Sequence, residues 1–113
     1  MPFINTKTNV KITDADRETL KSEFGKAIEL VGKSESWLML NFEDDCKMYF
    51  KGESSSPIAF VDVSVFGKST DEGCENMTKE ICSVLYKVLS IPADKVYVKY
   101  SGTTQWGWNN MNF

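Results

Sequence analysis

The sequence contains no histidine at all. This absence excludes catalytic nucleophiles of the Ser-His and Cys-His types, imidazole metal sites and a histidine general base. Acid–base chemistry must therefore use carboxylates, lysine, tyrosine, cysteine or a free α-amino group. The three cysteines, Cys46, Cys74 and Cys82, form no CxxC pair and no disulfide framework, so we interpret them as free thiols in a reducing compartment. We expect neither a metal nor a cofactor.

The chain also lacks a strong net charge and a long apolar run. A formal net charge of −3 gives no general attraction to nucleic acid or to an anionic membrane. No apolar stretch is long enough to span a bilayer, and the start of the chain lacks the basic and apolar blocks of a signal peptide. We therefore expect synthesis in the cytosol, with leaderless export left open. Residues 1–113 are expected to form a single domain.

The hydrophobic pattern predicts the order β-α-β twice. In the first half, residues 3–10 alternate as in a strand, a helix begins near Thr13 and Asp16 and ends at Gly32, and residues 37–43 form a second strand. Residues 47–50 are predicted as a short extra strand and residues 51–57 as a surface loop. In the second half, residues 58–66 form a strand, residues 67–70 turn into a helix, and residues 96–100 form the last strand.

The two halves repeat with a spacing of 57 residues. The apolar face of the first helix, Leu20, Phe24, Ala27, Ile28 and Val31, recurs as Met77, Ile81, Val84, Leu85 and Val88. This register predicts an α/β fold with a pseudo-two-fold axis, in which two helices pack on one face of a four-stranded mixed sheet. The same element order is also typical of ferredoxin-like modules that sense ligands or bind RNA, although the acidic balance argues against RNA.

We expect the other face of the sheet to be half exposed in a single chain. We place Pro2, Trp37, Tyr97 and Lys99 there, a mixture of aromatic and polar groups. Assembly into a symmetric ring would cover such a face.

Pro2 directly follows the initiator methionine. Removal of Met1 would expose a secondary amine, whose pKa is ~8 in model peptides and falls when the amine is buried or placed near a cation. Such an amine would be a neutral base at physiological pH. On position alone, the simpler interpretation is that Pro2 begins a strand, where its missing N–H costs little.

Several short motifs resemble those of the macrophage migration inhibitory factor (MIF) family, within the tautomerase superfamily. They are residues 1–4 (MPFI), 8–10 (TNV), 32–33 (GK), Pro57, 67–68 (GK), 92–97 (PADKVY), 107–110 (GWNN) and Phe113. The resemblance covers essentially the whole chain. It implies a homotrimer with a central channel and active sites between neighbouring subunits. It also implies keto–enol tautomerisation of phenylpyruvate-type aryl keto acids and isomerisation of L-dopachrome, with the trimmed terminal proline as the base.

The resemblance also implies roles for individual residues. Pro2, Lys33 and Tyr97 would be catalytic, with Tyr97 reaching the site of the next subunit. Substrate-binding positions would be Phe3, Trp37, Val65, Phe66, Lys99, Trp106, Trp108 and Phe113. Each has a simpler alternative: Lys33 suits a helix C-terminus, Tyr97 a cross-strand aromatic pair, Lys99 a solvated surface and the tryptophans a subunit interface. Relatives with thiol–disulfide activity carry a CxxC where this chain has Ile58 and Val61, so we expect no such activity.

Many members of the family are also signalling proteins that leave cells without a signal peptide. The resemblance therefore implies a cytoplasmic and secreted protein, with a cell-surface receptor as a further partner. Alternatives to the enzyme are a receptor-binding, cytokine-like protein with vestigial catalysis and a ferredoxin-like module that binds a small ligand.

Overall fold

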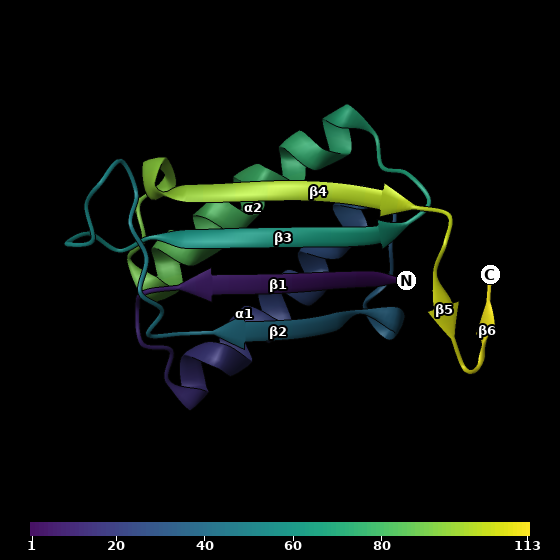
Figure 1. Cartoon of the computed structure of the whole chain (residues 1–113), viewed down its shortest axis with the longest axis horizontal. Coiled ribbons are helices and arrows are strands. Elements are labelled where there is room, and N and C mark those ends of the chain that lie inside the picture. The colour runs from purple at the N-terminus through teal and green to yellow at the C-terminus, as the bar shows by residue number, and fades with distance from the viewer.

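The chain folds as two β-α-β units that share one sheet (Figure 1). The computed structural model describes residues 1–113. The first unit comprises β1 (Pro2–Thr8), α1 (Asp14–Ala27), the 3-10 turns η1 (Ile28–Val31) and η2 (Glu35–Trp37), and β2 (Met39–Glu43). The second comprises β3 (Ala59–Phe66), α2 (Asp71–Leu89), η3 (Ala93–Lys95) and β4 (Val96–Thr103). A hairpin of two short strands, β5 (Gly107–Trp108) and β6 (Met111–Asn112), ends the chain.

The strand order β2-β1-β3-β4 confirms the predicted pseudo-two-fold arrangement. β1 and β2 are parallel, β3 and β4 are parallel, and the two central strands β1 and β3 are antiparallel. In the ferredoxin-like pattern another strand separates the two strands of each β-α-β unit. Here the strands of each unit pair directly, so the ferredoxin-like alternative is wrong for the fold.

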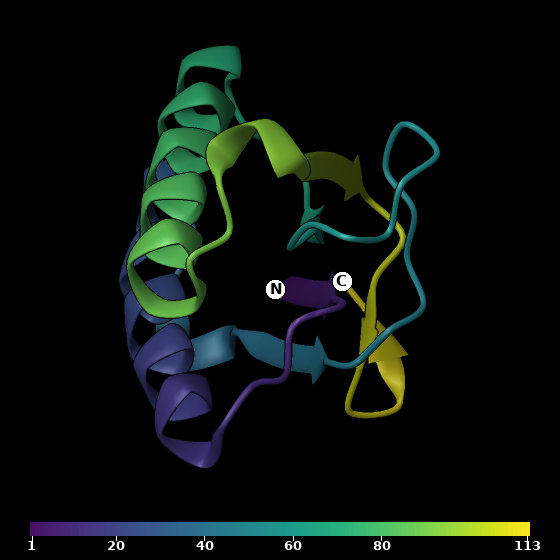
Figure 2. The ribbon, with the colours of Figure 1, turned by 90° about the vertical axis from the view of Figure 1, so that its left-hand side faces the viewer.

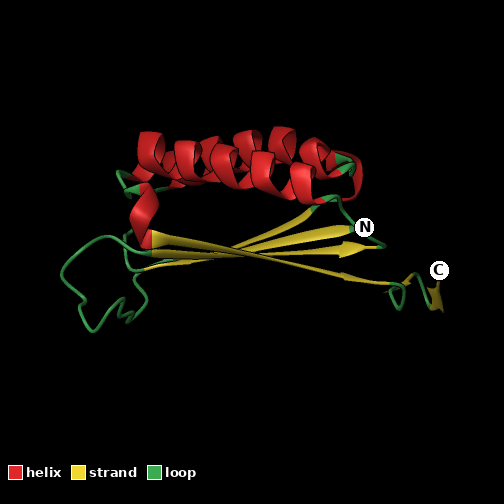
Figure 3. Ribbon diagram, turned by 90° about the horizontal axis from the view of Figure 1, so that it is seen from above, coloured by secondary structure: helices red, strands yellow, loops and turns green.

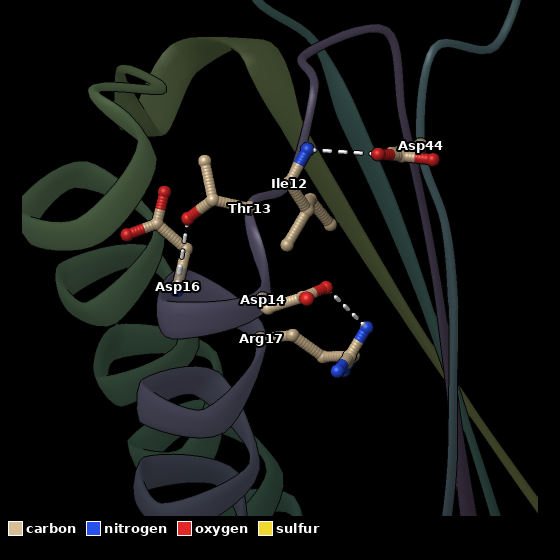
Figure 4. A network of polar contacts seen from close by, with 6 residues as sticks. All are labelled: Ile12, Thr13, Asp14, Asp16, Arg17 and Asp44. Atoms are coloured by element: carbon tan, nitrogen blue, oxygen red, sulfur yellow. Dashed lines mark hydrogen bonds and ion pairs between the residues drawn. The ribbon is translucent and has the colours of Figure 1, made fainter.

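The helices begin at equivalent threonines of the repeat. The Thr13 hydroxyl accepts a hydrogen bond from the Asp16 N–H (3.1 Å), and the Thr70 hydroxyl accepts one from the Gly73 N–H (3.0 Å). Figure 4 shows the first of these caps, beside the Asp14–Arg17 ion pair. The Asp44 carboxylate accepts from the Ile12 N–H (2.8 Å) and so joins the segment before α1 to the end of β2.

The core lies between the helices and the sheet (Figure 3). It is one cluster of sixteen buried residues, drawn from both helices and from the helix-facing sides of the central strands. All five paired apolar positions of the repeat contact or belong to this cluster. None of the helices combines the length and apolar composition needed to cross a membrane.

The extra strand predicted at residues 47–50 is absent. Only an isolated bridge joins Phe50 to Glu53, because the chain reverses at Lys51 (φ 52°) and Gly52 (φ 81°) before it can pair with the sheet. β2 begins at Met39 rather than Trp37, since the Ser34 hydroxyl caps the turn η2. The β5–β6 hairpin was not predicted. Figure 2 shows that this hairpin and the loop of residues 44–58 lie on the side of the sheet away from the helices.

The expected placement of Pro2 on the uncovered face is wrong. Along β1, Pro2 is buried in alternation with Ile4, on the side that faces the helices. Pro2 and Ile4 are two residues apart, and successive side chains of a strand alternate between its faces, so both lie on the same side. Tyr97 and Lys99 do lie on the uncovered face, where Tyr97 is 61% exposed.

Removing the Thr13 cap should destabilise the protein. Thr13→Ala leaves the Asp16 N–H without its acceptor, and such caps contribute about 1 kcal/mol to the free energy of unfolding. Urea unfolding measures the change. Thr19→Ala is the matched control, because Thr19 lies exposed inside α1 and alanine has the higher helix propensity. Equal stabilities for the two variants would contradict the cap.

The Tyr100 phenol should ionise only near pH 12. Burial raises the pKa of Tyr100 to about 12, even though its hydrogen bond with Thr78 (2.8 Å) opposes the rise. The unfolded chain, with a tyrosine pKa of ~10, loses this proton first. The free energy of unfolding should therefore be unaffected below pH ~10 and should fall as the pH rises toward 12.

Ultraviolet absorbance titration measures this ionisation directly. Thr78→Val should raise the pKa of Tyr100 further, because the Thr78 hydroxyl favours the phenolate. Tyr100→Phe should remove the late step from the titration, and persistence of that step would contradict the assignment.

Candidate active site

The start of β1 is fixed against the end of β3. Pro2 pairs with Val65 in the antiparallel ladder, and the Met1 carbonyl accepts a hydrogen bond from the Phe66 N–H (2.9 Å). The N-terminus therefore lies at the end of the sheet where β3 and β4 finish (Figure 1). Because Met1 precedes Pro2, the Pro2 nitrogen in this structure belongs to a peptide bond and is not basic.

Lys33 reaches the same place from the helical layer. Gly32, in the left-handed conformation (φ 77°), ends η1 and turns the chain back toward the sheet. The half-buried Lys33 ammonium then donates a hydrogen bond to the Phe66 carbonyl (2.8 Å). Burial, and secondly the positive charge of Lys33, lower the pKa of the Met1 α-amino group below its ordinary value.

A row of aromatic rings extends from this point. Phe66 packs against Phe113 with ring centroids 5.5 Å apart, and Phe113 stacks on Trp108 at 6.2 Å. Trp108 in turn meets Trp37 edge to face at 5.1 Å. The Phe113 N–H donates to the Trp106 carbonyl (3.1 Å), which closes the terminal hairpin. The structure thus brings Pro2, Lys33 and these four predicted aromatic residues to one end of the molecule.

Phe3 and Trp106 open instead onto the uncovered face of the sheet. Together with Met39, Ser64 and residues 101–103 they line a hollow of about 530 Å³. Neither Pro2 nor Lys33 contributes to this hollow. In one chain, the predicted site is therefore divided between two neighbouring regions.

Tyr97 and Lys99 lie far from Pro2 in the same chain. Tyr97 pairs with Phe60, whereas Pro2 pairs with Val65, five residues further along β3. At the usual rise of a strand, the two pairing positions on β3 are roughly 16 Å apart, and β3 also separates β1 from β4. Lys99 pairs with Asp62 in the same ladder, with its ammonium 3.7 Å from the Asp62 carboxylate. A single chain does not bring Tyr97 to Pro2.

Two residues that shape this arrangement were missed from the sequence. Phe50 packs against Tyr97, with ring centroids 5.1 Å apart. Gly102 allows β4 to approach the turn at Gly67, because a Cβ atom at Gly102 would collide with the Gly67 carbonyl. A glycine inside a strand pattern is itself a signal of such close approach. No group of three or more cysteine, aspartate or glutamate side chains is clustered as a metal site.

Replacing Lys33 should raise the pKa of the N-terminal amine. In the chain that retains Met1, Lys33→Ala removes one of the two causes of the lowered pKa, so the midpoint of an NMR titration should move upward. Lys21→Ala is the control, since Lys21 is an exposed lysine on α1 whose nearest carboxylate is that of Glu18. Equal midpoints in the two variants would contradict the influence of Lys33.

Comparisons with known proteins show the family of the chain. A family model described as macrophage migration inhibitory factor (MIF) matches residues 1–112. The macrophage migration inhibitory factor of Xenopus laevis is 32% identical, over 100% of this chain and 99% of that protein, and the rat protein is 27% identical over the same shares.

Solved structures show the same fold. The crystal structure of Leishmania major MIF2 has a TM-score of 0.92 and 34% identity, covering 100% of this chain and 97% of that chain. A MIF homologue from Prochlorococcus marinus has a TM-score of 0.88 and 26% identity, covering 98% of both chains. The chain therefore belongs to the macrophage migration inhibitory factor family, within the tautomerase superfamily.

Proposed function

We propose that this protein is a keto–enol tautomerase that uses the amine of Pro2, freed by removal of Met1, as its general base. The observation that carries the proposal is the Lys33 ammonium, which is bound to the Phe66 carbonyl beside the N-terminus. Burial, and secondly this positive charge, lower the pKa of the terminal amine. Family membership supports the reaction class.

The environment of Pro2 suits a neutral base. Pro2 is buried, and the Lys33 ammonium is held close to the N-terminus. Both disfavour a second positive charge, so the causes that lower the pKa of the Met1 amine also act on a Pro2 amine. A general base with a pKa near the working pH is the most efficient one.

The proposed reaction moves a proton within one substrate. The Pro2 nitrogen removes a proton from the carbon next to a carbonyl, and the electron pair of that C–H bond forms the enol double bond. The protonated Pro2 amine then returns the proton to another atom of the same substrate. No net oxidation occurs, and the base is regenerated. Tyr97 of a neighbouring chain would donate a hydrogen bond to the substrate carbonyl oxygen, where negative charge develops.

The substrate class follows from the charges and rings at the site. An ammonium has three donors, and Lys33 uses one of them for the Phe66 carbonyl, which leaves donors for a substrate carboxylate. The row formed by Phe66, Phe113, Trp108 and Trp37 offers stacking surface for an aryl ring. We therefore propose small enolisable aryl keto acids of the phenylpyruvate type, and L-dopachrome, as substrates.

The proposal requires more than one chain. Tyr97 and Lys99 lie too far from Pro2 within one subunit to act on the same substrate, so another subunit would have to supply them. A homotrimer with a central channel, as the resemblance implies, would do so while covering the open face of the sheet. Lys99 would then bind the anionic substrate, with Phe3, Val65 and Trp106 completing the pocket.

A second proposed role is signalling outside the cell. The names of the relatives describe an effect on macrophage migration. A cytokine-like role would require export without a signal peptide and a cell-surface receptor. Testing the cellular response with a Pro2→Gly variant would separate this role from catalysis.

Keeping the Pro2 nitrogen in an amide should remove general-base catalysis. A chain shown by intact mass to retain Met1 should have a kcat/KM for phenylpyruvate lower by about 100-fold or more than the chain that lacks it, the usual contribution of a general base. In chains that lack Met1, Pro2→Gly should cost less, because the terminal glycine still carries a free amine. Lys21→Ala should keep wild-type activity. Full turnover by the chain that retains Met1 would reject the proposed base.

A further inference from the structure

We propose that Phe50 is a positioning residue for Tyr97, acting in the active site of the neighbouring subunit. The inference rests on the proposed function and extends it to the loop of residues 44–58. In its own chain, Phe50 lies at the opposite end of the sheet from Pro2, because it packs against the residue that pairs with Phe60.

The contact between the two rings is geometrically specific. Phe50 meets Tyr97 edge to face, with centroids 5.1 Å apart and ring planes at 71°. Tyr97 is 61% exposed on the uncovered face of the sheet, so the rest of its ring is available to another chain. The Phe50 ring therefore restricts the rotation of the Tyr97 ring on the side where the two meet.

Phe50 is itself held firmly. Its N–H donates to the Glu53 carbonyl (2.8 Å), and the Glu53 N–H donates back to the Phe50 carbonyl (3.1 Å). The turn between them uses left-handed conformations at Lys51 (φ 52°) and Gly52 (φ 81°), as in the tight turns of hairpins. This isolated bridge fixes the backbone of Phe50 without extending the sheet.

The ammonium groups of two lysines lie over the Phe50 ring. The ammonium groups of Lys51 and Lys95 lie 5.7 Å and 5.4 Å from its centroid, within the range of cation–π contacts. Lys95 is in η3, directly before β4, and Lys51 is at the hairpin tip. Phe50 therefore joins the loop to the start of β4, where the Tyr97 side chain projects from the uncovered face of the sheet.

This arrangement matters for the rate because catalytic groups must be placed to within a small distance. If Tyr97 donates to the substrate carbonyl in the next subunit, loosening its ring should lower kcat while leaving substrate binding by Lys33 almost intact. Phe50 would act through Tyr97 and would not touch the substrate.

The test is a double-mutant cycle on phenylpyruvate turnover by chains that lack Met1. Phe50→Leu should lower kcat about 5-fold with little change in KM, and Tyr97→Phe should lower kcat at least as much. In the Tyr97→Phe background, Phe50→Leu should have no further effect. Phe50→Trp, which keeps an aromatic edge, should restore most of the rate. Tyr49→Leu, which removes a 72% exposed ring from the same loop, should change nothing.

A purely structural role gives different results. If the losses from Phe50→Leu and Tyr97→Phe multiply in the double variant, Phe50 does not act through Tyr97 and the inference is overturned. NMR of the Tyr97 ring protons gives an independent readout, because loss of the Phe50 ring should shift them even in an inactive chain. If Phe50→Leu and Phe50→Met, which has a longer and unbranched side chain, both prevent folding or assembly, Phe50 is structural and the inference is also overturned.

Failure of the proposed function would look different. Full activity in the chain that retains Met1 would reject the tautomerase mechanism whatever Phe50 does. Loss of activity in the chain that retains Met1, combined with wild-type kinetics in trimmed Phe50→Leu, would reject only the role of Phe50.

Discussion

The backbone of Phe66 is the point on which the candidate active site depends. Its N–H binds the Met1 carbonyl and its carbonyl binds the Lys33 ammonium, so one residue joins the start of β1, the end of β3 and the segment after η1. The next residue, Gly67, donates to the Thr103 carbonyl (2.8 Å) and adds the end of β4. Four segments far apart in sequence therefore meet through main-chain groups, which do not require particular side chains at position 66.

The charge at this point follows from how the first helix ends. The Gly32 N–H donates to the Glu29 carbonyl (2.9 Å), and the Lys33 N–H donates to the Ile28 carbonyl (3.3 Å). With Gly32 in the left-handed conformation, these bonds terminate the helix. A residue directly after such an end leaves the helix axis at a defined angle. The position of Lys33 beside the N-terminus is thus a product of local backbone geometry, and its positive charge adds to burial in lowering the pKa of the terminal amine.

The fold could be predicted from the sequence because its signals are local and occur twice. The threonine caps and the apolar helix positions are spaced 57 residues apart in both pattern and structure. The closing strands depart from that spacing: Leu40 and Phe42 correspond in burial to Val98 and Tyr100, which are 58 residues later. This single-residue offset changes which side chains face the core, so the repeat alone could not place every residue of β4.

The site was less accessible to sequence reasoning. Pro2 was assigned to the wrong face, although the two-residue alternation of a strand places it on the same side as Ile4. The β5–β6 hairpin has strands of two residues, too short for an alternation pattern to be visible. Phe50 carries no signal of its own, since its importance arises from a contact with Tyr97, 47 residues away, that only the folded loop creates.

The distance between Tyr97 and Pro2 has a consequence for mixed populations of chains. Under the proposed function, each catalytic centre would combine the base of one polypeptide with the phenol of another. A defect at Pro2 and a defect at Tyr97 of the same polypeptide would therefore affect two different centres. Two differently damaged polypeptides, each inactive alone, could regenerate an intact centre when co-assembled. Activity would then depend on which polypeptides assemble together and not on any one polypeptide alone.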